Sequence, residues 1–193
     1  MTEWMTEIAG IAFIRSLILF GGLFFVGFGL HLLTRMMAGF LCSVFGNRAG
    51  LFIVNRLTFI GTIHHELSHA LFAFLTGAKV VEINLLNFSG DSLGNVRFIP
   101  RGGRILQAVQ RCAAAIAPVA CGALTLFLLI QYVNPMYAAS NVKWIFYYIE
   151  VSIFLHMTLS ETDVKTMIKG LPILFCLVFV ILCIAIRLGE SVL

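Results

Sequence analysis

Long apolar runs, interrupted by few charged residues, are the feature of this sequence that most limits how it can fold. Of the 193 residues, 60% are hydrophobic and only 11% are charged, and the mean hydropathy is +1.00. A soluble domain usually has about a quarter of its residues charged. So few charges cannot cover a water-facing surface of this size, and we therefore expect most of the apolar side chains to face lipid.

Five of these runs approach the length of a transmembrane helix, which requires roughly 20 mostly apolar residues. They are Ile11–Leu33, Leu51–Leu75, Ile105–Val133, Trp144–Leu159 and Leu171–Ile186. The pair Asn134-Pro135 predicts a turn after the third run, and the polar segment Ser160–Asp163 is expected to end the fourth. The N-terminus is acidic and has no basic residue before Arg15, unlike a signal peptide, so we expect the first run to be retained.

The segment between the second and third runs, from Lys79 to Arg104, has a different pattern. Its apolar and polar residues alternate on either side of a stretch rich in turn-forming residues. This pattern predicts a β-hairpin with strands at Val80–Leu85 and Asn95–Ile99. The expected fold class is therefore an all-α polytopic membrane protein, a single domain over residues 1–193, with about five transmembrane helices and a small β-hairpin between the second and third.

The basic residues lie mainly at the ends of the apolar runs, where they indicate orientation in a membrane. If five helices alternate in direction, the side of the hairpin has the larger number of basic residues. That side would carry Lys79, Arg97, Arg101, Arg104, Lys165 and Lys169, and the other side Arg35, Arg48, Lys143 and Arg187. We therefore predict a multi-pass integral membrane protein with the hairpin in the cytoplasm. No patch combines basic with aromatic residues, so no nucleic-acid partner is expected.

The motif His65-Glu66-Leu67-Ser68-His69 lies inside the second apolar run. On a helix, residues four apart lie on one face, so two imidazoles at this spacing can bind one Zn²⁺. Zinc lowers the pKa of a bound water to roughly 7, and the glutamate beside the first histidine can take its proton. Ionisable groups at membrane depth are costly and usually functional. We therefore predict that His65 and His69 bind one zinc ion and that Glu66 is the catalytic base, as in metalloproteases with this spacing.

A catalytic zinc site usually has three protein ligands, so the third must come from elsewhere in the chain. The candidates in the sequence are His64, Asp91, Glu150, His156, Glu161 and Asp163. His64 points about 100° around the helix from its neighbour in the motif and cannot easily share the same ion. Matching the expected depth of the motif in the membrane favours the segment Ser160–Asp163, but it does not choose between Glu161 and Asp163.

Together these features resemble the site-2 protease class of intramembrane metalloproteases (peptidase family M50). The string GTIHHELSHA, which begins at Gly61, is similar to the metal-binding helix of that family, and Ala115–Val119 is similar to a small-residue and proline stretch in its next core helix. The resemblance covers residues 51–165. It implies His65, His69 and Asp163 as the ligands and Glu66 as the general base, because Ser160-x-x-Asp163 is similar to the third-ligand pattern of one branch of the family.

The resemblance further implies a zinc metalloendopeptidase that hydrolyses peptide bonds of transmembrane protein substrates within the lipid bilayer. Its active site would lie toward the cytoplasmic side. A helical substrate must first become extended, and one hairpin strand could then pair with it; a hairpin that only caps the helices is the alternative. One alternative function is a catalytically inactive scaffold that binds metal. An ion or metal transporter is less favoured, because the paired broken helices of many transporters are missing from the sequence pattern.

Overall fold

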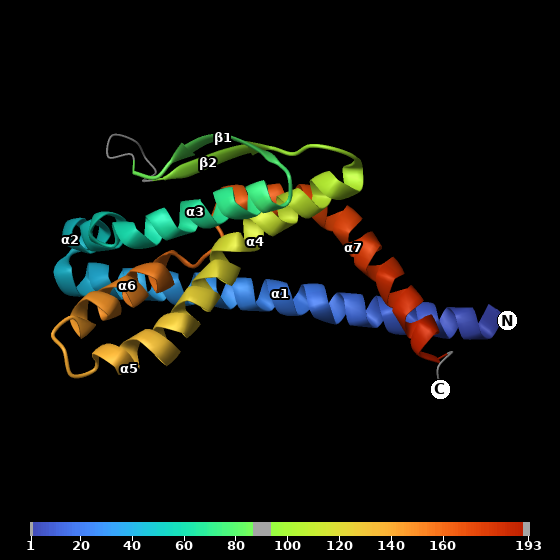
Figure 1. The fold of residues 1–193 in the computed structure, drawn as a ribbon, viewed down its shortest axis with the longest axis horizontal. Helices are drawn as coiled ribbons and strands as arrows, with labels where there is room; N and C mark the ends of the chain where they lie inside the picture. Colours follow the sequence, from blue (N-terminus) through green and yellow to red (C-terminus); the bar gives the residue numbers. More distant parts are fainter. Residues whose placement is uncertain (1, 87–93, 191–193) are drawn as a thin grey trace.

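The computed structural model describes residues 2–86 and 94–190, which form mainly helices and one two-stranded antiparallel sheet (Figure 1). The helices are α1 (Thr2–Phe45), α2 (Asn47–Phe52), α3 (Phe59–Leu75), α4 (Arg104–Leu128), α5 (Asn134–Tyr137), α6 (Lys143–His156) and α7 (Glu161–Glu190), with π-helical turns η1 (Ile53–Leu57) and η2 (Leu129–Val133). The strands are β1 (Lys79–Asn84) and β2 (Asn95–Ile99). In the view of Figure 1 the sheet lies above α3, and α1 lies below it.

Three of the described helices are long and apolar enough to cross a membrane, which indicates a membrane protein. They are Met5–Phe45, Arg104–Tyr137 and Glu161–Gly189. The prediction of about five spanning helices is not confirmed. Helix α3 has 17 residues and α6 has 14, which makes them about 25 Å and 21 Å long. Both are shorter than the roughly 30 Å of a hydrocarbon core.

The second apolar run is also interrupted, where one continuous helix was expected. Helix α1 continues past the predicted end of the first run, and Gly46, with a φ of 82°, reverses the chain into α2. There Gly50 packs so closely on α1 that an added Cβ would lie 2.6 Å from the Cα of Cys42. The π-helical turn η1 follows, and at its end the Thr58 hydroxyl donates to the Val54 carbonyl at 2.6 Å. Helix α3 starts directly after this break.

The polar segment after the fourth run begins α7, whereas the sequence predicted that it would end the helix before it. The Ser160 hydroxyl accepts a hydrogen bond from the Asp163 backbone N–H at 3.2 Å, and the Asp163 carboxylate accepts one from the Ser160 N–H at 2.8 Å. This reciprocal pair is a capping box, which favours a helix start. Lys165 and Lys169 therefore lie within α7. They were expected in a loop on the hairpin side of the membrane, so the predicted excess of basic residues on that side loses this support.

The predicted turn at Asn134-Pro135 is helical as well. Pro135 lies in the first turn of α5, where its missing N–H needs no partner and its fixed φ suits a helix. The third apolar run thus continues through the π-helical turn η2 to Tyr137.

The predicted hairpin is confirmed. Strands β1 and β2 pair antiparallel, beginning with Lys79 opposite Ile99. Buried Gln110 of α4 holds both ends of the hairpin, since its amide donates to the Thr76 carbonyl at 3.0 Å and its carbonyl accepts from the Arg101 N–H at 2.8 Å. The position of the sheet is therefore fixed from α4.

Small residues allow the helices around α4 to approach closely, as is common in membrane bundles. At Gly170 of α7, an added Cβ would lie 2.7 Å from the Ala108 carbonyl oxygen of α4. A buried cluster of Cys112, Ala115 and Met167 extends the same contact between the two helices. Helix α4 also packs against α3, so it positions α3 and α7 relative to each other.

Candidate metal centre

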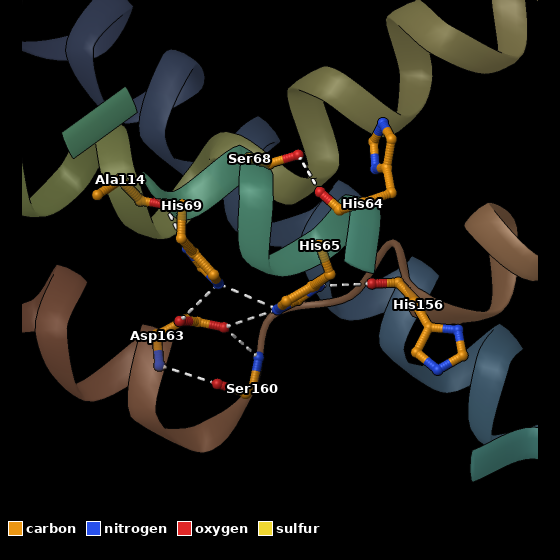
Figure 2. A network of polar contacts seen from close by, with 8 residues as sticks. All are labelled: His64, His65, Ser68, His69, Ala114, His156, Ser160 and Asp163. Atoms are coloured by element: carbon orange, nitrogen blue, oxygen red, sulfur yellow. Dashed lines mark hydrogen bonds and ion pairs between the residues drawn. The ribbon is translucent and has the colours of Figure 1, made fainter. Parts of the chain in front are cut away.

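Three side chains from two helices meet at one point beside α4. His65 and His69 of α3 and Asp163 of α7 each offer one ligand atom, and these atoms lie within 4.8 Å of one another. In Figure 2 all three side chains point toward a common centre. His69 and Asp163 are buried and His65 is half-buried, so the group is largely shielded from solvent. It is a site that could hold a metal ion.

The distances within this group agree with those expected around a tetrahedral ion. The two Nε2 atoms are 3.0 Å apart, and the Asp163 oxygens lie 3.2 Å from His69 Nε2 and 3.7 Å from His65 Nε2. Zinc bonds of about 2.0–2.1 Å at tetrahedral angles would separate the donor atoms by about 3.3 Å. Two imidazole nitrogens and a carboxylate are also ligand types that zinc prefers, so the residues present fit this ion.

Two backbone carbonyls fix the orientation of the imidazole rings. His65 Nδ1 donates to the His156 carbonyl, and His69 Nδ1 donates to the Ala114 carbonyl, both at 2.7 Å (Figure 2). A carbonyl can only accept, so each Nδ1 carries a proton and, in a neutral ring, each Nε2 keeps its lone pair. Metal-binding histidines are commonly oriented in this way. Two lone pairs 3.0 Å apart repel each other unless a cation or proton lies near both.

The carbonyl that orients His65 is itself held by a contact between α6 and α3. The buried Ser152 hydroxyl accepts from the Gly61 N–H at 2.7 Å and donates to the Thr58 carbonyl at 2.8 Å. A Cβ at Gly61 would overlap the Ser152 carbonyl oxygen, so this approach requires glycine. The end of α6 is thus fixed one turn before the motif, and with it the His156 carbonyl.

The third side chain, Asp163, is positioned by the capping box of α7. One carboxylate oxygen accepts from the Ser160 N–H and lies 3.7 Å from His65, while the other lies 3.2 Å from His69. A carboxylate in the first turn of a helix also interacts favourably with the helix dipole. The same interaction that begins α7 therefore aims Asp163 at the two histidines.

Glu66 shares a cavity of about 590 Å³ with the three convergent side chains. It is half-buried, and no hydrogen bond ties its carboxylate to another described residue. Strand β2 forms one wall of the cavity through Asn95, Val96 and Phe98. One cavity thus borders Glu66 and the three convergent side chains together.

The remaining candidates for a third ligand do not join this group. Glu161 is almost fully exposed and lies 3.7 Å from Lys165, one turn further along α7. The His64 ring bonds Thr125 of α4 at 3.0 Å and points away from the centre in Figure 2. The Glu150 carboxylate accepts from Asn134, and the His156 ring bonds the Ser152 carbonyl. Asp91 lies outside the described residues.

Sequence reasoning did not identify the Ala114 and His156 carbonyls as parts of the site. Every residue has a carbonyl, so no residue type marks one that orients a histidine. The bend in the chain after His156, which leaves its carbonyl unused by α6, also has no clear sequence signal. The small residues of α4 around Ala114 would have been the nearest hint, because they let α3 approach the backbone.

No protein-family profile, curated protein or solved structure matches this chain.

Proposed function

We propose that this protein is an intramembrane zinc metalloprotease that hydrolyses peptide bonds of membrane-spanning substrates. The observation that carries the proposal is the convergence of His65, His69 and Asp163 in a cavity that Glu66 also lines. Three protein ligands with a fourth position open are typical of catalytic zinc, whereas structural zinc usually has four. A glutamate beside the first ligand, facing the same cavity, provides the general base that hydrolysis requires.

In this mechanism zinc, when bound, supplies a Lewis acid that makes water more acidic and polarises the scissile carbonyl. The chain's own residues do the remaining work. Glu66 takes a proton from the attacking water and later gives it to the leaving amine. The backbone carbonyls of Ala114 and His156 keep the two imidazole rings turned toward the cavity. Asp163 completes the ligand set and contributes the negative charge that balances the cation.

The substrate is a transmembrane segment that becomes extended at the site, because a helix shields its own peptide bonds. Strand β2 lines the cavity and leads away from Glu66, which supports pairing of an extended substrate with this strand. Helix-weakening Gly or Pro residues in a target should therefore increase its cleavage. A target cleaved equally well after all such residues are replaced would argue against this mode of binding.

The active site is proposed to face the cytoplasmic side of the membrane. The support is the group of basic residues on and beside the hairpin, since positive charge favours the cytoplasmic side. These residues are Lys79, Arg97, Arg101 and Arg104. A cysteine accessibility assay on residues of β1 in sealed vesicles would test this orientation.

The decisive experiment compares zinc content and cleavage in the wild type with those in variants of the site. In reconstituted vesicles, Glu66→Gln should keep its zinc but lose cleavage of a transmembrane substrate, by roughly 10²–10⁴-fold. Asp163→Ala should lose both zinc and cleavage, whereas Glu161→Ala, changed two residues away at an exposed position, should keep both. Zinc retained in Asp163→Ala would contradict the proposed ligand set.

The same experiment distinguishes the alternatives. A wild type that binds zinc but cleaves no transmembrane substrate, with Glu66→Gln unchanged in cells, would indicate a metal-binding scaffold. Metal uptake into vesicles that is lost in Glu66→Gln would indicate a transporter.

A further inference from the structure

The start of strand β2 lies directly against the side chain of Glu66. If Gly94 carried a Cβ, that atom would lie 2.5 Å from Glu66 Cγ and 3.1 Å from both Cδ and Oε1. Real Cβ atoms hardly ever approach a neighbour this closely. The absence of a side chain at Gly94 therefore creates the space that the Glu66 side chain occupies.

Backbone conformation does not explain the glycine at this position. The described glycines with positive φ are Gly46, Gly77 and Gly102, and Gly94 is not among them. Any residue could adopt its backbone conformation without strain, so the only requirement found for glycine here is the space beside Glu66.

Contacts at the far end of β2 hold the strand on the helices. Phe98 of β2 and Val80 of β1 pack on a buried cluster of Ala73, Ala78 and Ala114. Gln110 also holds the chain just beyond β2 through the Arg101 N–H. The Glu66 side chain, by contrast, has flexible torsions and no hydrogen bond to another described residue. A Cβ at position 94 should therefore displace Glu66 and leave the sheet in place.

We infer that Gly94 is a positioning residue for the general base: because it has no side chain, the chain entering β2 leaves room for Glu66 in the conformation that lines the same cavity as the three candidate ligands. This inference rests on the proposed function for its catalytic consequence. The close contact itself is a property of the fold, and it can be tested without any activity. Gly94 is not one of the three candidate ligands, so zinc binding should not depend on it.

The catalytic test compares Gly94→Ala and Gly94→Val with the wild type in reconstituted vesicles. Zinc content should stay at the wild-type level and KM should change little, while kcat falls on the order of 10²-fold, since a displacement of about 1 Å can have this effect. Valine should reduce kcat more than alanine. Gly103→Ala, directly before α4, is the control, because a Cβ there meets nothing within 4 Å. It should keep the wild-type kcat.

The contact is tested separately by thermal unfolding in detergent. Gly94→Ala should lower the Tm, and this loss should largely disappear in a Glu66→Ala background, because the clashing side chain is then gone. Equal loss in both backgrounds would contradict the contact. A wild type without proteolytic activity overturns the proposed function. An active wild type matched by an equally active Gly94→Ala overturns this inference alone.

Discussion

The long helix α1 and the region around the candidate metal centre differ in how some of their buried hydroxyls are hydrogen-bonded. In α1, hydroxyls bond to the preceding turn of the same helix: Ser16 donates to the Ala12 carbonyl at 2.9 Å, and Thr34 to the His31 carbonyl at 3.0 Å. Around the centre, Ser68 also bonds within its own helix, but other polar groups bond across elements that are far apart in the chain, as Ser152 does with Gly61. The first arrangement needs no neighbour, whereas the second fixes two elements relative to each other.

The two regions also differ in how far their side chains are exposed. Apolar side chains of α1 project outward, with Phe25 80% and Phe28 67% exposed. In water such a surface would favour aggregation or binding, but it suits contact with acyl chains. At the centre, His69 is only 7% exposed and its ring is held from both sides. The outward face of α1 thus suits contact with lipid, while the site depends on particular contacts between helices.

The largest effect that follows from this comparison is expected at His65. His65→Ala removes one of the three side chains that could hold the metal, so bound zinc should fall to background and cleavage should be lost. His64→Ala is the matched control in the next position, because its ring bonds Thr125 and does not face the centre. It should keep its zinc and show at most a moderate fall in stability, of about 1 kcal/mol. Metal analysis of the two purified variants checks the prediction, and equal zinc content would contradict it.

A smaller effect is expected where a residue acts on the site through another. Ser152→Ala removes two of the hydrogen bonds that hold the end of α6 against the start of α3. The His156 carbonyl should then orient His65 less well, and zinc affinity should fall roughly 10–100-fold, as when the partners of metal ligands are removed. Competition with a chromogenic chelator measures this affinity. An unchanged affinity would show that α6 does not position His65.

Acidification should release the metal, and this prediction concerns the ligands as a group. A proton and zinc compete for the same Nε2 lone pairs, so zinc affinity must fall as the pH falls. The folded helices should outlast this loss, because the buried α4–α7 cluster of Cys112, Ala115 and Met167 gains no charge on acidification. When zinc content and the helical circular dichroism signal are followed over the same pH series, zinc should therefore be lost at a higher pH than helicity. If helicity were lost together with the metal, the ion would be needed for the fold itself.

Much of the fold follows from local sequence patterns. The alternation around Glu82 and Arg97 predicted both strands, since an edge strand has one solvated face. The spacing of His65 and His69 predicted their convergence, since four residues make about one helical turn. The hairpin joins two segments that follow each other in the chain, and the histidine pair lies on one helical face, and for that reason both can be predicted from the chain alone.

The parts that could not be predicted depend on contacts between distant segments. The run Leu51–Leu75 has the composition of one spanning helix, but the approach of Gly50 to Cys42 and the π-helical turn divide it. Depth along an assumed fourth helix could not choose between Glu161 and Asp163, because that helix ends earlier. A capping box at Ser160 turns Asp163 inward and leaves Glu161 exposed. This choice is set by where α7 begins, and hydropathy does not mark that point.

The smallest effect is expected at Ser16, and it completes the comparison with Ser152. Both serines are fully buried, so the two serine-to-alanine changes remove the same hydroxyl from equally buried positions. The Ser16 hydroxyl adds a second bond to a carbonyl of its own helix. Ser16→Ala should therefore change the free energy of unfolding by no more than about 0.5 kcal/mol and leave zinc affinity unchanged. Ser152→Ala should cost about 1–3 kcal/mol, because the groups it bonded lie on another helix. Unfolding in detergent measures both. Equal losses of stability would mean that burial alone determines what a hydroxyl contributes to the free energy of unfolding. It would then not matter whether the hydrogen bond stays within one helix or joins two.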